Sequence, residues 1–268
     1  MLYGLLLVGG KSRRMGTDKS QLIYQNDTPE WRRLKTLLTE LCEEVYLCHP
    51  EGQHFADSKS ILDPGDGPLK AIHSAQLAHP EAAWLTLACD MPLLDLKSLR
   101  HLVESRDPSK PSTCYLSPID QLPEPLCAIY EPSSSAAIAR GIPENQLCPR
   151  SYLKDAHHVT PLSPHALINA NSPADKIEVQ AILEGTQTEK KLTLQYFAQL
   201  KELTKKAEED LSTQYATASG LYEQIKTKYK FPYKQKDLML AINDEYVSWE
   251  QLLKEGDNVV FIPPVAGG

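Results

Sequence analysis

Several features that mark specialised protein classes are missing from this sequence of 268 residues. The six cysteines form no CxxC pair and have irregular gaps, which favours reduced thiols over zinc ligands or a disulfide framework. No apolar run approaches the roughly 20 residues that cross a bilayer. Residues 1–8 are apolar, but no basic region precedes them and no small-residue cleavage site follows, so they are typical of a buried strand rather than a signal peptide. We therefore expect a cytoplasmic protein without a membrane partner.

An excess of positive charge is also missing. The net charge of −7 argues against broad nucleic-acid binding through a basic surface. This acidity belongs to residues 1–189, which hold 17 Lys and Arg against 24 Asp and Glu, whereas residues 190–268 hold 11 of each kind. All arginines and histidines lie in the first part. The break predicts a domain over 1–184, a polar linker over 185–190 and a second domain over 191–268.

A glycine-rich basic loop follows the first apolar segment. Residues 2–8 are continuously apolar, as in a strand that is covered on both faces. Gly9 and Gly10 come next, and such a pair lets the backbone turn sharply and approach a ligand. Four basic side chains surround this loop: Lys11, Arg13, Arg14 and Lys19. Neither GxxxxGK[ST] nor GxGxxG is present, but backbone amides beside basic side chains still predict phosphate binding.

Two aspartates follow later apolar segments. Asp63 opens the string Asp-Pro-Gly-Asp-Gly-Pro-Leu, and Asp90 lies in Cys-Asp-Met-Pro directly after residues 83–88. Either aspartate alone is more typical of a helix cap or a turn. Beside a basic glycine loop, however, an aspartate at the end of a strand suits a Mg²⁺ ligand.

Strand-like and helical segments alternate in the first part. Strand-like runs cover 2–8, 44–48, 60–62, 83–88 and 126–130, and apolar residues recur at helical spacing over 31–41. The alternation predicts an α/β domain with a mostly parallel sheet and helices on both faces. In such sheets, ligands bind at the carboxyl ends of the strands.

These motifs together resemble a known family. The string from Leu7 to Lys19 resembles the signature of molybdenum cofactor guanylyltransferases, which join GMP from GTP to molybdopterin. The strings around Asp63 and Asp90 match that family's next two motifs in order and spacing. Residues 169–175 resemble its late Asn-x-Asn-Thr-Pro-x-Asp segment. The resemblance covers roughly residues 1–183 and implies a Rossmann-like, three-layer nucleotidyltransferase domain.

The resemblance also implies roles for residues at the matching positions. The nucleotide site would comprise Leu7, Val8, Gly9, Gly10, Arg14, Lys19, Cys48, Asp63 and Asp90. Within it, Lys19 would bind phosphates and Asp90 would hold Mg²⁺, and these are the two catalytic residues that we expect in this domain. Asn169, Asn171 and Arg150 would lie on the pterin side.

The sequence departs from the family at a few places. Cys48 stands where the family often has asparagine, which puts a base or ribose contact there in doubt. Lys70 replaces an alanine and would add a charge near the nucleotide. The proline-rich segment 111–165 matches poorly, and its role does not follow from the sequence.

Residues 190–268 carry a different pattern. Strand-like runs over 192–197, 238–242 and 258–262 surround a helical pattern that Thr217 can cap. With the first and last strands central, this order predicts a β-grasp α+β domain. After the last run, Pro263 and Pro264 stiffen the chain, and Gly267-Gly268 form a thread without side chains that can enter a narrow active site.

This second segment resembles the small subunit of molybdopterin synthase, a ubiquitin-like sulfur carrier, over its whole length. Residues 196–203 match that family's opening motif, and residues 256–268 match its ending. The resemblance implies a thiocarboxylate at Gly268, formed after an ATP-dependent activating enzyme adenylates the carboxylate. It also implies the catalytic subunit of molybdopterin synthase as a partner, with a molybdenum insertase as a further candidate.

The two resemblances name one pathway and predict a bifunctional protein of molybdenum cofactor biosynthesis. One alternative is a cytidylyltransferase, although Gly9-Gly10 favours guanine. Another is an inactive scaffold domain fused to a thiamine-type sulfur carrier, although the Pro-Pro-Val-x-Gly-Gly ending favours molybdopterin synthase.

Overall fold

A computed structural model describes residues 1–8, 18–53, 55, 57–118, 120–163 and 165–264. Its contacts divide the chain into two compact units, Met1–Asn169 and Ala170–Gly268. Each unit has a sheet and hydrophobic clusters of its own.

The first unit is built on a seven-stranded sheet of order β3-β2-β1-β4-β6-β5-β7. Its strands are β1 (Leu2–Leu7), β2 (Glu44–His49), β3 (Lys59–Leu62), β4 (Ala83–Ala88), β5 (Ser112–Leu116), β6 (Pro123–Tyr130) and β7 (His157–Val159). Strands β3, β2, β1 and β4 are parallel, which confirms the expected parallel core. Strand β6 runs antiparallel to β4, so the sheet as a whole is mixed.

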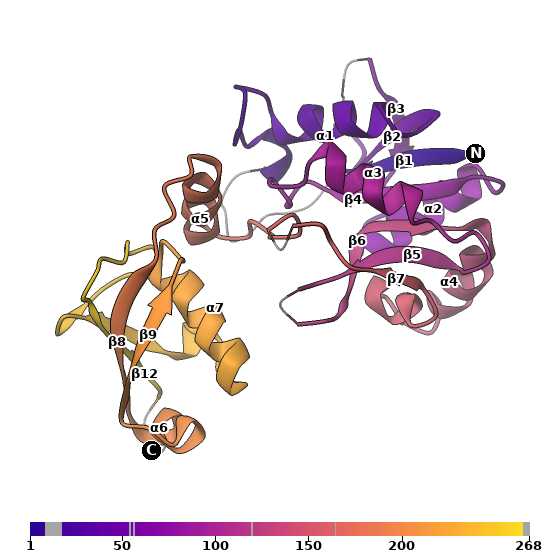
Figure 1. Cartoon of the computed structure of the whole chain (residues 1–268). Coiled ribbons are helices and arrows are strands. Elements are labelled where there is room, and N and C mark those ends of the chain that lie inside the picture. The colour runs from indigo at the N-terminus through magenta and orange to yellow at the C-terminus, as the bar shows by residue number, and fades with distance from the viewer. Residues whose placement is uncertain (9–17, 54, 56, 119, 164, 265–268) are drawn as a thin grey trace. The chain divides into compact units, whose positions relative to one another are not determined.

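Helices cover both faces of this sheet (Figure 1). They are α1 (Glu30–Thr39), α2 (Pro68–Ala78), α3 (Leu96–Glu104) and α4 (Ser135–Gly141). Apolar side chains of α1 and α3 join one buried cluster with Leu6 and Leu87, while those of α2 and α4 join another with Leu5 and Trp84. Because neighbouring strand residues point to opposite faces, the continuous apolar run of β1 supplies both clusters. This arrangement confirms the three-layer α/β fold.

The proline-rich segment completes the sheet. It contributes β5, β6 and β7. Tyr115 of β5 ties this segment to α3, because its hydroxyl donates to the Ser98 carbonyl at 2.5 Å. Strands β5 and β7 are parallel to each other and antiparallel to β6. They therefore run in the same direction as β4, so their carboxyl ends meet at the edge where β4 ends and β6 begins.

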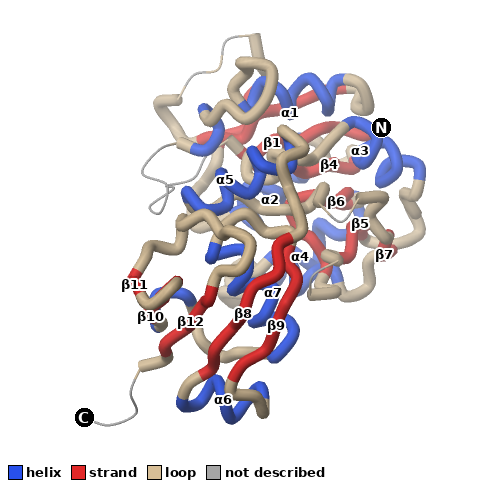
Figure 2. Tube along the Cα trace, turned by 60° about the vertical axis from the view of Figure 1, so that its left-hand side comes forward, coloured by secondary structure: helices blue, strands red, loops and turns tan. Residues whose placement is uncertain are grey.

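The second unit holds a five-stranded sheet of order β11-β10-β12-β8-β9. Its strands are β8 (Lys190–Tyr196), β9 (Glu208–Thr213), β10 (Met239–Ile242), β11 (Glu245–Tyr246) and β12 (Asn258–Ile262), and its sheet is packed with α6 (Ala198–Thr204) and α7 (Ala218–Tyr229). The first and last strands, β8 and β12, are parallel and lie side by side within the sheet (Figure 2). The hydroxyl of Thr217 accepts from the Gly220 amide and caps α7. These features confirm the predicted β-grasp order.

A further helix, α5 (Pro173–Leu183), belongs to the second unit by its contacts. A capping box starts it: the Ser172 hydroxyl accepts from the Asp175 amide, and the Asp175 carboxylate accepts from the Ser172 amide. The Glu178 carboxylate accepts from the amides of Ala216 and Thr217 at 2.9 and 2.6 Å, and from the Thr217 hydroxyl at 2.7 Å. The contacts therefore group residues 170–184 with the second unit, whereas the polar stretch 185–190 predicts a boundary after 184.

Candidate functional site

Lys19 and Asp90 face each other at the carboxyl edge of the parallel strands. The Lys19 Nζ lies 3.8 Å from Asp90 Oδ2, and about a fifth of each side chain is exposed. Burial raises the pKa of the Asp90 carboxyl, and the charge of Lys19 only partly offsets this effect. The second oxygen, Oδ1, is buried and has no hydrogen-bond partner among the described residues. One oxygen of this carboxylate is thus left to bind a ligand.

The loop that carries Asp90 is held by a side chain from the turn before α1 and by one from α1 itself. The amide of Gln25 donates to the Pro92 carbonyl at 2.7 Å, and the guanidinium of Arg33 donates to the Leu94 carbonyl at 2.7 Å. Arg33 is in turn fixed by a bidentate pair with the buried carboxylate of Glu30, at 2.6 and 2.8 Å. Charge-assisted forks of this kind fix geometry as well as charge. Sequence reasoning missed these supports, although the i, i+3 spacing of Glu30 and Arg33 is a signal for their pairing.

The first strand ends just before the glycine-rich segment of the sequence. Leu7 is the last residue of β1, and the Val8 amide donates to the Cys48 carbonyl of β2 at 3.0 Å. Lys19 starts a short 3₁₀ turn, Lys19–Gln21, which is capped by the carboxylate of Asp18. Between them, the expected loop residues Gly9, Gly10 and Arg14 lie outside the described residues.

Cys48 and Asp63 also lie at this edge, with different surroundings. The Cys48 side chain is only 1% exposed, and burial, followed by the charge of Asp63, raises the pKa of its thiol to about 12. The thiol is therefore part of the core, and a side-chain contact between Cys48 and a nucleotide has no support. Asp63 Oδ1 accepts from the Gly65 amide at 2.9 Å, so this partly exposed aspartate shapes its turn.

The beginning of β6 brings an unexpected acid to the same edge. Glu124 is 7% exposed, and its Oε1 accepts from the Leu126 amide at 3.1 Å. Next to it, Arg150 Nε donates to the Pro123 carbonyl at 2.9 Å, from the short helix η3 (Pro149–Leu153). Sequence reasoning included Arg150 but missed Glu124, whose only signal is a carboxylate at the start of an apolar strand.

The described residues fit a magnesium ion only as part of a larger site. They include no group of three or more His, Cys, Asp or Glu side chains that could hold a metal ion by themselves. Mg²⁺, however, is usually held by one or two carboxylates together with substrate phosphates and water. The unpartnered Oδ1 of Asp90 suits that kind of coordination.

Two family models match this chain. Residues 4–159 match the model of the MobA-like NTP transferase domain. The chain belongs to the MobA-like NTP transferase family. Residues 194–268 match the model of the ThiS family.

Individual relatives cover mainly the first unit of this MobA-like protein. A "Molybdenum cofactor biosynthesis bifunctional protein" from Synechocystis is 32% identical over 182 residues, which span 65% of this chain and 52%, about half, of the relative. A "Probable molybdenum cofactor guanylyltransferase" from Synechococcus elongatus is 32% identical over 64% of this chain and 94% of the relative. The crystal structure of "Molybdopterin-guanine dinucleotide biosynthesis protein A" from Archaeoglobus fulgidus superposes with a TM-score of 0.56 at 18% identity, over 69% of this chain and 100% of that one, which shows a shared fold.

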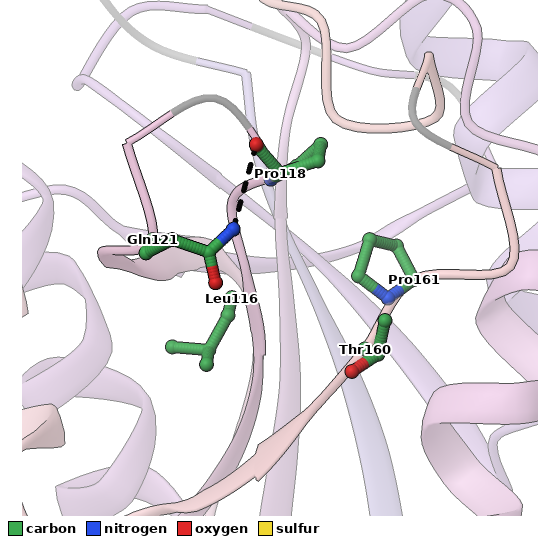
Figure 3. Close-up of a pocket in the computed structure, with 5 residues that line it drawn as sticks. All are labelled: Leu116, Pro118, Gln121, Thr160 and Pro161. Carbon is green, nitrogen blue, oxygen red and sulfur yellow. Dashed lines mark hydrogen bonds between the residues drawn. The ribbon is translucent and has the colours of Figure 1, made fainter.

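A pocket lies at the same sheet edge of this MobA-like unit, beyond β6. It has a volume of about 150 Å³ and is lined by Leu116, Pro118, Gln121, Thr160 and Pro161. Figure 3 shows these side chains around it, with Gln121 Nε2 donating to the Pro118 carbonyl at 3.4 Å. Leu116 ends β5 and Thr160 follows β7, so the proline-rich segment forms this part of the edge.

The residues expected on the pterin side are divided between the units. Asn169 is the last residue of the first unit, where its Nδ2 donates to the Leu167 carbonyl at 3.3 Å. Asn171 lies in the second unit, where its amide donates to Asp175 at 2.8 Å. The structure thus gives their backbone segment a local role at the start of α5, and their pterin role stays a prediction.

Gly268 lies outside the described residues. No helix among the described residues is long and apolar enough to cross a membrane.

Proposed function

We propose that the first unit transfers GMP from GTP to molybdopterin and releases pyrophosphate. The observation that carries this proposal is the Lys19–Asp90 pair beside the end of β1, in a chain whose curated relatives are named molybdenum cofactor guanylyltransferases. In a sheet of this type, the nucleotide binds at the carboxyl ends of the strands, where this pair lies.

The chemistry needs charge stabilisation rather than a nucleophilic side chain. The attacking group is the phosphate of the pterin, which is already ionised, and pyrophosphate leaves from the α-phosphorus of GTP. Lys19 places a positive charge where phosphate oxygens gain negative charge in the transition state. Asp90 would hold Mg²⁺, which neutralises phosphate charge when it is bound. The fork of Arg33 on Glu30 fixes the loop after Asp90, so this carboxylate is positioned before the substrate arrives.

The acceptor, molybdopterin, would bind on the β6 side of Asp90, away from β1. The pocket between β5 and β7 opens at that side of the edge, and Arg150 lies near the start of β6. A pterin ring suits a mainly apolar hollow, and a guanidinium at the same sheet edge suits its phosphate. This placement supports Arg150 on the pterin side, as the sequence predicts.

A nucleotide panel tests this function. With molybdopterin and Mg²⁺, turnover of GTP should exceed that of CTP and ATP by at least about tenfold, which corresponds to roughly 1.4 kcal/mol. Equal use of CTP would move the protein to the cytidylyl class, and no turnover of any nucleotide would leave a scaffold domain.

We further propose that the second unit carries sulfur as a thiocarboxylate on Gly268. The match of residues 194–268 to the ThiS family and the β-grasp sheet with a central β12 support this role. Its partners would be an ATP-dependent activating enzyme and the catalytic subunit of molybdopterin synthase, with a molybdenum insertase as a further candidate. The protein would act in the cytoplasm, where its six free cysteines stay reduced.

Mass spectrometry tests the sulfur-carrier role. With the activating enzyme, ATP and a sulfur donor, the intact protein should gain about 16 Da at its last residue, the difference between sulfur and oxygen. A variant with one alanine added after Gly268 is the matched control, since it keeps the fold but moves the carboxylate by about 3.5 Å. An unchanged mass, while a related carrier is labelled in the same tube, would remove this role.

A further inference from the structure

Glu124 is a buried carboxylate that the proposed chemistry does not yet use. Glu124 is the second residue of β6, and it is 7% exposed. Its Oε1 accepts a hydrogen bond from the Leu126 amide at 3.1 Å. Burying a charged carboxylate that accepts a single hydrogen bond costs free energy, so a purely structural role would favour glutamine or an apolar residue here.

Neighbouring strands bring Glu124 and Asp90 to one edge of the sheet. Strands β4 and β6 pair antiparallel, with Leu87 opposite Cys127 and Thr86 opposite Ala128. Asp90 follows the end of β4 by two residues and Glu124 is the second residue of β6, so both carboxylates belong to the same edge of this strand pair. The electrostatics agree, since burial first, and then the charge of Asp90, raise the pKa of the Glu124 carboxyl.

The two carboxylates have complementary unused oxygens. Asp90 Oδ1 is buried without a partner among the described residues. The hydrogen bond that Glu124 accepts from the Leu126 amide uses Oε1, so it does not occupy Oε2. The cations nearby are engaged otherwise: Lys19 pairs with Asp90 Oδ2 at 3.8 Å, and Arg150 Nε donates to the Pro123 carbonyl. Two neighbouring buried carboxylates repel each other, and a divalent cation between them removes that repulsion.

We propose that Glu124 is a second carboxylate for the divalent cation that Asp90 holds. It would bind the cation from the β6 side, between the nucleotide edge over β1 and the acceptor pocket beside β5. This inference rests on the proposed function, because it assigns Glu124 to the cation of that same reaction. With two carboxylates, the ion would need fewer contacts from the substrate phosphates. It would also keep a fixed position between the nucleotide and the acceptor.

Manganese binding to the full chain tests the proposal without relying on turnover. Free Mn²⁺ is measured by electron paramagnetic resonance in the presence of a non-hydrolysable GTP analogue. Glu124→Gln keeps an oxygen to accept from the Leu126 amide and removes the charge. We expect it to weaken Mn²⁺ binding by about tenfold or more, and Asp90→Asn to weaken it further.

Asp120→Asn is the matched control for charge alone. Asp120 is exposed, accepts from the Leu122 amide at 3.1 Å, and also raises the pKa of Glu124 through its charge. Its replacement should change Mn²⁺ affinity by less than about twofold. Wild-type affinity in Glu124→Gln, with a loss in Asp90→Asn, would overturn the role of Glu124 alone. No Mn²⁺ binding by the wild-type protein would overturn the metal-dependent function with it.

A measurement on the wild-type protein covers the case in which Glu124→Gln does not fold. Fe²⁺ replaces the cation, and ascorbate with peroxide generates radicals that cleave the backbone close to the bound ion. We expect cleavage near residue 90 and near residue 124, both suppressed by excess Mg²⁺. Cleavage near residue 90 alone would contradict the proposal.

Discussion

Asp90 and Glu124 in the first unit and Glu209 in the second unit are carboxylates with opposite surroundings. Glu30 of the first unit resembles Glu209, since Arg33 donates to both of its oxygens. In the first unit, burial raises the pKa values of Asp90 and Glu124, because few donors reach their oxygens. In the second unit, burial also works to raise the pKa of Glu209, but donors overcome it and hold this pKa at about 2. The hydroxyls of Tyr196 and Tyr229 donate to Glu209 at 2.8 and 2.6 Å. A carboxylate that stabilises a fold is surrounded by donors, whereas one that serves a ligand keeps oxygens open.

The contrast extends to other polar atoms. Among the described residues, the buried side-chain atoms without a partner lie mostly in the first unit, including those of Thr86, Asp90 and Ser112, and only Asn258 Oδ1 lies in the second. Of these atoms, Asp90 Oδ1 is the one at the candidate site, because Thr86 is in the middle of β4 and Ser112 starts β5 at the opposite edge. We infer that Asp90 gives up some stability at this site, whereas Glu209 stabilises the second unit. The predictions below test this division.

The largest effect is expected from Asp90→Asn. Losing the carboxylate should lower GMP transfer by about 10³-fold, or about 4 kcal/mol, in line with the loss of one preorganised electrostatic contact. The melting temperature should stay unchanged or rise slightly, because the variant removes a charge whose burial costs free energy. Steady-state kinetics and calorimetry on the same preparation measure both. A large loss of stability would show that Asp90 stabilises the fold, as Glu209 does.

The next largest effect concerns α5. The composition break predicts that a fragment of residues 188–268 folds alone, but the hydrogen bonds of Glu178 to Ala216 and Thr217 stabilise the start of α7 from outside that fragment. A fragment of residues 170–268 should therefore be more stable by about 3 kcal/mol, the cost of leaving such buried donors unpaired. Urea unfolding of both fragments measures the difference.

The Glu178→Gln variant of the longer fragment is the control for the side chain itself. It should lose most of the added stability while keeping α5. Equal stability of the two fragments would place the boundary after residue 184, where the sequence alone predicts it.

A smaller effect is expected from Glu209→Gln. The variant should lose about 2 kcal/mol of stability in the second unit, because charge-assisted hydrogen bonds from tyrosines and lysines become neutral. Since the folded pKa of about 2 lies below the ordinary value of 4.5, this contribution is present above pH 4.5 and is lost as the pH falls towards 2. Acid unfolding curves should therefore converge for wild type and variant at low pH.

Glu208→Gln is the matched control, because Glu208 is the exposed neighbour of Glu209. It should change neither stability nor its pH dependence measurably. GMP transfer should be unaffected in both variants, and a loss of transfer in Glu209→Gln would break the division between the two units.

The smallest effect is expected from Lys70→Ala. The sequence predicts an added charge near the nucleotide, but the Lys70 Nζ pairs with Asp66 at 2.8 Å, so its charge is compensated locally. We expect the KM for GTP to change by less than about twofold, since exposed pairs of this kind contribute little. A tenfold rise in KM would show that Lys70 reaches the phosphates after all.

Local patterns predicted much of the fold. The apolar run 83–88 is β4 with the same bounds, and Thr217 caps α7 as expected. Such features depend on residues that are near in sequence, where periodicity and capping preferences apply.

Features that depend on distant residues could not be predicted in this way. Arg33 reaches the Leu94 carbonyl across 61 positions, and Glu178 reaches Thr217 across 39. Glu124 becomes a candidate only when the antiparallel pairing of β4 with β6 puts the end of one strand beside the start of the other. The motif strings assign Lys19 and Asp90 to one site, and the structure brings these two side chains within 3.8 Å of each other. Cys48 has a buried side chain, which its motif position did not predict. The roles of all three residues stay predictions.

The position of β12 has a consequence for how the protein is made. This strand is the latest of its sheet in the chain, yet it lies between β10 and β8. Until residues 258–262 leave the ribosome, β8–β9 and β10–β11 are two separate strand pairs with open inner edges, and isolated pairs of strands are marginally stable. The first unit can fold earlier during synthesis, since domains generally fold as units from the N-terminal side. A nascent chain would thus hold a finished first unit beside an unfinished second one, which makes the second unit the one most exposed to aggregation and to chaperones.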